Sequence, residues 1–272
     1  AFYGCTNLET MAMPETIHAL GEQSFYNCKK LTTFGLTEKG VIPGGMTEIP
    51  KGCFYNCNAL QGELVIPEGV TTICQEAFYG LKAITSITMP NTVNSWGPEG
   101  AYAQFSGCSN VTSITLSENL TSLPRNCFFS CTGLTALPDL KNITELGNAC
   151  FQHMDGAKEI VVPAQVTYMG NLCFAYCDVL EKVEILGDPD MGTDAFANAP
   201  MLTTVTGNFT TIGESMFEKC TGLVSFRMPD QVTYIGKNAF MSCTALESVV
   251  FPASYSAPTL SMGVEPFKSC KA

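Results

Sequence analysis

Fourteen cysteines are the residues of this 272-residue chain with the greatest capacity for chemistry. A thiol can pair in a disulfide, ligate a metal, or lie buried as a small apolar group. Three pairs have the spacing C-x-x-x-C: Cys53/Cys57, Cys127/Cys131 and Cys173/Cys177. None of them has a second pair of ligands at the spacing of a zinc site. The cysteine pattern therefore predicts no metal site and no cofactor.

One short segment carries the residue types of a thiol nucleophile, its base and an orienting acid: Cys150, His153 and Asp155. Cys150, however, occupies a position that recurs along the chain, which favours a core role over a nucleophile. The chain has only two histidines, which leaves little for general acid–base catalysis. We therefore predict a protein that is not an enzyme.

The acidic residues of the chain cluster once, at Asp188, Asp190 and Asp194. Gly192 occupies the third ligand position of a calcium loop, so the segment is predicted to be a turn and not a cation site. The net charge of −11 opposes binding to nucleic acid, because such binding depends on Lys and Arg neutralising phosphates. No apolar stretch reaches the roughly 18 residues that a membrane span needs, so we predict no transmembrane segment in this chain.

Twelve phenylalanines recur at intervals of 21 to 29 residues, which predicts one short unit repeated end to end. Those at both ends are Phe2 and Phe267. The others are predicted to form the structural core: Phe25, Phe54, Phe78, Phe105, Phe128, Phe151, Phe174, Phe196, Phe217 and Phe240. The repeats make the chain a quasi-one-dimensional domain in which each unit contacts its neighbours.

Cysteine follows the anchor phenylalanine by three residues in nine units and precedes it directly in four more. Seven of the nine are predicted to be core residues: Cys28, Cys57, Cys108, Cys131, Cys177, Cys220 and Cys243. Thiols stacked in threes, such as Cys220, Cys243 and Cys270, cannot all pair in disulfides. Locked positions in a repeat are typical of buried free thiols that act as small hydrophobes.

Each unit contains the signals of two elements. Apolar residues at steps of three or four after the anchor predict a helical turn. The alternating stretch that follows, as in residues 84–89, predicts a short strand, and Pro closes many units. Glycine four residues before the anchor, as at Gly170 and Gly236, suggests a backbone with positive φ.

The phrase P-x-x-V-x-x-I-G-x-x-A-F-x-x-C-x-x-L, which the units of Phe217 and Phe240 fit almost letter for letter, resembles the BspA-like leucine-rich repeats of bacterial surface proteins, notably of Bacteroides. The resemblance implies a leucine-rich-repeat solenoid of α/β units of about 23 residues. A parallel β-sheet would line the concave face, with short helical turns or coil on the other. We expect a single domain over residues 1–272 with about 12 units, both termini lying inside repeats as in a fragment or an uncapped chain.

The outward residues of the strands would form a face that is either a ligand surface or plain solvent-exposed sheet. The candidate partner-binding residues on it are Thr88, Thr115, Val161, Glu184, Thr206 and Arg227. Three units are lengthened, at residues 37–42, 96–102 and 253–262, and such insertions often form binding loops along one edge. Tyr102 is the candidate for an exposed aromatic contact there.

The resemblance to BspA-like proteins implies a non-catalytic binding module at the cell surface or outside the cell. Its curved repeat surface would bind a protein or glycan partner, in adhesion to a host or to other microbes. The alternative is a structural spacer that projects another domain from the cell surface.

Overall fold

The computed structural model describes residues 1–13, 16–34, 42, 45–255 and 259–271. The chain divides into two compact units, Ala1–Leu134 with Pro138–Asn142 and Thr135–Leu137 with Ile143–Ala272. Among the described residues there are nineteen short strands and no helix, and the strand pairs within each unit are parallel. Most of residues 37–42 and residues 256–258, within two of the predicted insertions, lie outside the described part of the chain.

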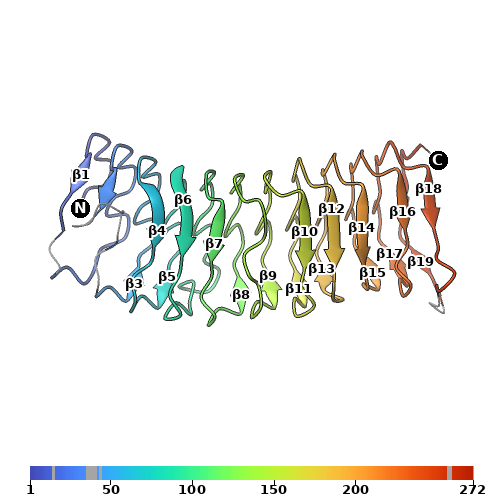
Figure 1. The fold of residues 1–272 in the computed structure, drawn as a ribbon, viewed down its shortest axis with the longest axis horizontal. Coiled ribbons are helices and arrows are strands. Elements are labelled where there is room, and N and C mark those ends of the chain that lie inside the picture. Colours follow the sequence, from blue (N-terminus) through green and yellow to red (C-terminus); the bar gives the residue numbers. More distant parts are fainter. Residues whose placement is uncertain (14–15, 35–41, 43–44, 256–258, 272) are drawn as a thin grey trace. The chain divides into compact units, whose positions relative to one another are not determined.

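The first unit contains two kinds of sheet (Figure 1). The longer strands pair in the order β4-β6-β7, and they span Gln61–Val65, Ala83–Thr88 and Ser113–Thr115. The shorter strands precede the anchor phenylalanines, and they are β3 (Glu48–Ile49), β5 (Thr72–Ile73) and β8 (Ser122–Leu123). β1 (Thr10–Met11) pairs with β2 (Thr33–Phe34).

The second unit repeats this arrangement. Its longer strands are β10 (Glu159–Val162), β12 (Lys182–Ile185) and β14 (Thr204–Gly207), followed by the pair β16 (Ser225–Arg227) and β18 (Ser248–Val250). The short strands are β9 (Glu145–Leu146), β11 (Tyr168–Met169), β13 (Asp190–Met191), β15 (Thr211–Ile212), β17 (Tyr234–Ile235) and β19 (Ser261–Met262). In the second unit each turn thus carries one long and one short strand, which makes it a parallel-strand solenoid. The first unit follows the same plan, but the turn after β6 has only an isolated bridge, at Ser95, in place of its short strand.

Alternation along each long strand decides which side chains face the core. In β10, Ile160 and Val162 are buried while Glu159 and Val161 are exposed. The register pairs Ile160 with Val183, and Val183 with Val205, so equivalent residues of successive turns stack directly. Because the side-chain period of a strand is two, this register also aligns the outward residues into ladders.

The anchor phenylalanines stack into a column inside each unit. Successive rings from Phe2 to Phe128 have centroids 5.3 to 5.6 Å apart and interplanar angles of 14° or less. In the second unit the centroid spacing from Phe151 to Phe267 is 5.2 to 6.0 Å. Each ring between the ends of a column packs against the rings of the neighbouring turns, and these stacked rings are among the largest fully buried side chains of the protein.

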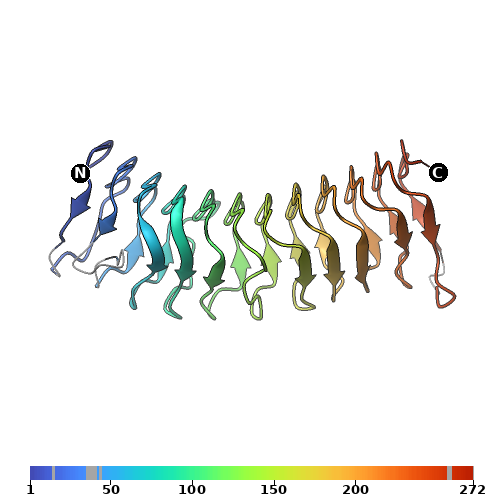
Figure 2. The same ribbon diagram turned by 45° about the horizontal axis from the view of Figure 1, so that its top comes forward.

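The predicted helical turns are wrong, because the segment around each anchor is a run of β-turns. Gly52 (φ 57°) and Asn56 (φ 55°) flank Phe54 with left-handed backbone, which a right-handed helix cannot contain. The N–H groups of these three residues donate to carbonyls of the next turn at 2.7 to 2.9 Å. The N–H groups that alternate with them donate three residues back, from Tyr55 to Gly52 at 3.2 Å and from Cys57 to Phe54 at 3.1 Å, and this produces the same steps of three. Figure 2 shows these anchor turns stacked side by side within each unit.

The positive φ expected for the glycines four residues before the anchors is also wrong. Neither Gly170 nor Gly236 has a positive φ. Instead, a Cβ on Gly236 would lie 2.6 Å from the backbone nitrogen of Glu214, and one on Gly263 would lie 2.5 Å from that of Lys237. Glycine is needed at these positions because the backbones of successive turns approach too closely for a side chain.

Candidate interaction surface

The strand face of the first unit carries short polar side chains in register. Glu63, Ser86 and Ser113 form one outward ladder, and Thr88 and Thr115 form a second beside it. Thr115 is exposed and Thr88 half-buried. The Thr88 hydroxyl donates to a carboxylate oxygen of Glu63 at 2.9 Å, so it is engaged within the protein.

The strand face of the second unit is more charged and more apolar. In one ladder the Nζ atom of Lys182 lies 2.7 Å from Oε1 of Glu159, and both side chains are exposed. In the next ladder Val161, Glu184 and Thr206 are paired in register and exposed. Exposed ion pairs contribute little to stability, so the strands do not depend on the Lys182–Glu159 pair.

Arg227 ends the ladder of β16, beside Val250 of β18, and both side chains are exposed. Within the described residues Arg227 forms no ion pair, whereas Lys182 on the same face does. The candidate residues therefore fall into two sets: Thr88 and Thr115 on the first unit, and Val161, Glu184, Thr206 and Arg227 on the second.

Tyr102, the aromatic candidate of the 96–102 insertion, is half-buried. The guanidinium carbon of Arg125 lies 4.7 Å from the centre of its ring, a cation–π contact that covers one ring face. Trp96 of the same insertion donates from Nε1 to the carbonyl of Ser122 at 2.8 Å. Both aromatic residues thus anchor the insertion to the neighbouring turn.

Eight of the nine thiols that lie three residues after an anchor are hydrogen-bond donors. Each donates from Sγ to the backbone carbonyl of the anchor phenylalanine one turn earlier, at distances of 3.0 to 3.8 Å. These pairs are Cys28/Phe2, Cys57/Phe25, Cys108/Phe78, Cys131/Phe105, Cys177/Phe151, Cys220/Phe196, Cys243/Phe217 and Cys270/Phe240. All fourteen cysteines are free thiols, and twelve are buried.

Burial also suppresses the reactivity of these thiols. It raises the pKa of Cys108, Cys177 and Cys243 to about 12. The thiolate is the nucleophilic and metal-binding form, and at neutral pH these groups are fully protonated. In the described part of the chain no three His, Cys, Asp or Glu side chains are close enough together to hold a metal ion.

Cys150, His153 and Asp155, the residue types of a nucleophile, a base and an acid, each have a structural role. Cys150 is fully buried in the core. His153 has a left-handed backbone (φ 60°), and its ring stacks on Tyr176 with centroids 5.2 Å apart. The Asp155 carboxylate accepts from the backbone N–H of Asp178 at 3.3 Å. Each side chain thus stabilises the stacking of turns.

Asp188 of the acidic cluster ties two turns together. Its two carboxylate oxygens accept from the backbone N–H and from the hydroxyl of Thr210, both at 2.8 Å. A carboxylate with this role is a turn-stabilising group, and its two oxygens are already paired.

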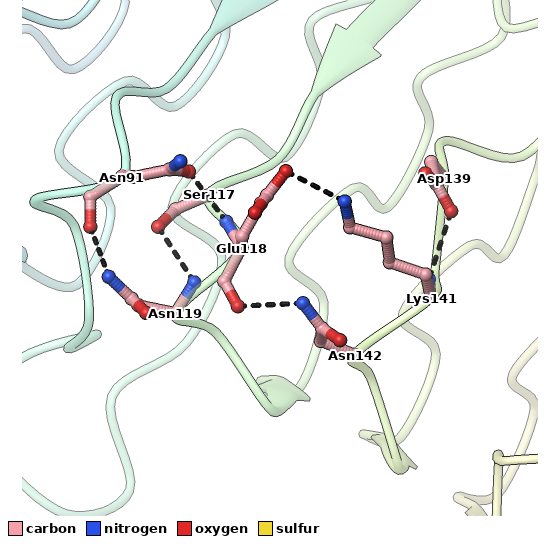
Figure 3. Close-up of polar contacts among 7 residues, drawn as sticks. All are labelled: Asn91, Ser117, Glu118, Asn119, Asp139, Lys141 and Asn142. Atoms are coloured by element: carbon pink, nitrogen blue, oxygen red, sulfur yellow. Dashed lines mark hydrogen bonds and ion pairs between the residues drawn. The ribbon is translucent and has the colours of Figure 1, made fainter.

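A chain of polar contacts links three successive loops of the first unit (Figure 3). The Asn119 amide donates to the Asn91 carbonyl at 2.5 Å, and the Asn142 amide donates to the Glu118 carbonyl at 2.9 Å. Lys141 adds an ion pair to the Glu118 carboxylate at 2.7 Å. These asparagines hold successive loops in register, which is a structural role.

A ladder of stacked tyrosines was not predicted from the sequence. Tyr3, Tyr26, Tyr55 and Tyr79 stack in a ladder with ring centroids 4.4 to 4.8 Å apart. Burial and the neighbouring phenols raise the pKa of Tyr55 to about 12. The signal was visible in the sequence, because each tyrosine directly follows an anchor phenylalanine.

Parallel strands repeated once per turn over a phenylalanine column define a leucine-rich-repeat solenoid. The chain belongs to the BspA-type leucine-rich repeat family, since the model of the BspA type leucine rich repeat region matches residues 1–100, 100–203 and 157–272. A search of curated protein sequences found no match. No helix in the described residues is long and apolar enough to cross a membrane.

Solved structures of bacterial leucine-rich repeat proteins are similar to this chain. The protein from Bacteroides ovatus is 28% identical with a TM-score of 0.69, and the match covers 99% of this chain and 78% of that one. A leucine-rich cell surface protein from Faecalibacterium prausnitzii is 22% identical with a TM-score of 0.57, covering 94% of this chain and 79% of that one. A protein from Eubacterium ventriosum is 15% identical with a TM-score of 0.55, covering 97% and 83%. The last two similarities concern the fold alone.

Proposed function

We propose that this chain is a non-catalytic binding module of a cell-surface or secreted protein. Its partner is a protein or a glycan, which it contacts through the outward side chains of the long strands. Membership of a repeat family typical of bacterial surface proteins supports the location. A role in adhesion to a host or to other microbes fits such a module.

The observation that carries the proposal is the in-register pairing of the long strands. It holds outward side chains at a spacing of about 4.8 Å from turn to turn. Thr115, Val161, Thr206 and Arg227 are exposed on this rigid support. Pre-positioned side chains lose little conformational entropy on binding, so an extended ladder can bind a long partner through many weak contacts.

The chemistry of the thiols supports a non-catalytic role. The buried cysteines are protonated, and those after the anchors donate to backbone carbonyls. The remaining candidates for catalysis, His153 and the aspartates near it, contribute to contacts between turns. The contacts of these cysteine, histidine and aspartate side chains stabilise the stacked turns, and we propose that none of these side chains acts as a nucleophile.

The alternative role as a spacer is favoured by the polar side chains that the strand face uses internally. Thr88 bonds to Glu63, and Lys182 pairs with Glu159. If the chain is a spacer, replacing its outward side chains should leave partner binding unchanged. If it is a binding module, the same replacements should weaken binding.

The test is a binding screen of the immobilised chain against panels of extracellular-matrix proteins and glycans. We expect the double variant Thr115→Glu/Arg227→Glu to lose the partner that the wild type binds, while its melting temperature changes little, because exposed strand residues contribute little to stability. Thr221→Glu is the matched control, since Thr221 is exposed but lies in an anchor turn. Equal binding by all three proteins would favour the spacer.

A further inference from the structure

A small hollow of about 230 Å³ lies where β14 and β16 end. Its rim carries Thr206, Asn208, Arg227 and Asp230. Two of these residues, Thr206 and Arg227, are outward strand residues, so the inference rests on the proposed function and names the chemistry of a ligand for that face.

The hollow is built by the end of β14. Gly207 has a φ of 150°, in a region that side chains rarely adopt. A Cβ there would also clash with the backbone carbonyl of Ile185 on the preceding turn. The floor is apolar, since Met228 and Pro229 are buried. An apolar floor with a few convergent polar groups is typical of a ligand site.

Three polar side chains at the rim have no partner within the described part of the protein. Neither the hydroxyl of Thr206, the amide of Asn208 nor the guanidinium of Arg227 forms an intramolecular hydrogen bond there, and all three residues are exposed. Asp230 accepts from the Ser254 hydroxyl through Oδ1 at 2.9 Å, which leaves its second oxygen open. The rim therefore offers a planar cation, a neutral amide, a hydroxyl and a carboxylate oxygen to a ligand.

We propose that this hollow binds a uronate unit, the carboxylate-bearing ring of an acidic glycan. The fork of Arg227 matches a carboxylate and forms the charge-assisted bonds that fix its orientation. The ring hydroxyls donate to Asp230 and exchange hydrogen bonds with Asn208 and Thr206. The volume is below the 300 Å³ or so of drug-sized sites, which suits a single ring.

The presence of Asp230 separates this ligand from other anions. A phosphate group would meet a like charge at the rim without offering enough hydroxyl donors to compensate for it. An acidic peptide side chain would satisfy Arg227 but leave the free oxygen of Asp230 without a donor. A uronate supplies an acceptor and several donors on one ring, so it complements both charges.

The test is isothermal titration of the full chain with D-galacturonate, D-glucuronate and a short oligogalacturonate. We expect binding of the oligomer, and a loss of about tenfold or more in affinity for Arg227→Ala, because a hydrogen bond to a charged group is lost. Lys182→Ala is the matched control: it removes the same charge from the same strand face outside the hollow, and we expect no change beyond about twofold at moderate salt. Arg227→Lys keeps the charge but loses the fork, and we expect it to bind more weakly than wild type.

Two further ligands make the outcome decisive. Methyl-esterified oligogalacturonate keeps the hydroxyls and loses the charge, so we expect weak binding. Poly-glutamate that binds as tightly as the oligogalacturonate would overturn the assignment to a sugar, as would equal losses for Arg227→Ala and Lys182→Ala. Absence of uronate binding would overturn the inference alone if Thr115→Glu/Arg227→Glu still abolishes capture of a partner in the panel screen, because the proposed function would then stand.

Discussion

The thiol of Cys243 donates a hydrogen bond to the backbone carbonyl of Phe217 in the preceding turn, with 3.1 Å between Sγ and the oxygen. The same carbonyl accepts from the backbone N–H of Cys220 at 3.2 Å. Both donors are buried, so the carbonyl is satisfied without water. Cysteine three residues after the anchor thus both fills the core as a small apolar group and donates a hydrogen bond to the preceding turn.

Removing one of these thiols should destabilise the protein. We expect Cys243→Ala to lower the free energy of unfolding by about 1 to 3 kcal/mol, because it deletes a buried donor and leaves a small void. Cys5→Ala is the control, since Cys5 is exposed. Denaturant unfolding of both variants measures the difference, and an equal effect of the two substitutions would argue against the hydrogen bond.

The buried thiols also predict how stability depends on pH. Burial raises the pKa of Cys243 from 9.0 to about 12 in the folded protein. Between these values the unfolded chain has lost the proton that the folded protein keeps, so the free energy of unfolding falls as pH rises through this window. We expect the melting temperature to fall above about pH 9, and to fall less steeply in Cys243→Ala. Identical slopes for the two proteins would mean that this thiol titrates normally.

The phenylalanine column predicts a large cost for a single truncation. The ring of Phe78 lies 5.5 Å from that of Phe54 and 5.3 Å from that of Phe105. We expect Phe78→Ala to lower the free energy of unfolding by about 3 to 5 kcal/mol, and Tyr3→Ala, whose ring is exposed, to have a much smaller effect. A loss below about 1 kcal/mol for Phe78→Ala would show that the ring is not in a packed core.

The glycines before the anchors predict opposite outcomes at equivalent positions. We expect Gly236→Ala to be destabilising by about 2 kcal/mol, because its Cβ would meet the backbone of the preceding turn. Gly21 has the same place in its repeat, but a Cβ there would lie 3.6 Å from the nearest heavy atom, the hydroxyl of Ser24. Gly21→Ala should be neutral or slightly stabilising. Thermal unfolding separates the two variants, and similar losses would argue against the close approach.

Residue spacing was sufficient to predict the column of phenylalanines and the alternation of buried and outward residues along the strands, because both depend on periodicity. The parallel pairing of the strands was implied by the resemblance to BspA-like repeats. Residue spacing could not separate a helical turn from a run of β-turns, since both place Phe54, Cys57 and Leu60 at steps of three. Asn56 two residues after the anchor was the available signal, because asparagine tolerates left-handed backbone. The role of Gly236 and the hydrogen bond from Cys243 to Phe217 depend on how one turn stacks on the next, which no single repeat specifies.

Site-specific photo-crosslinking can show whether the strand face contacts the partner. The photoreactive residue is placed singly at Thr115, at Val161, at Tyr102 in the insertion and at Thr221 in an anchor turn. We predict crosslinks to the bound partner from Thr115 or Val161 and none from Tyr102 or Thr221. Crosslinks from Tyr102 without any from the strand positions would show that the partner binds the inserted loop and not the strand face.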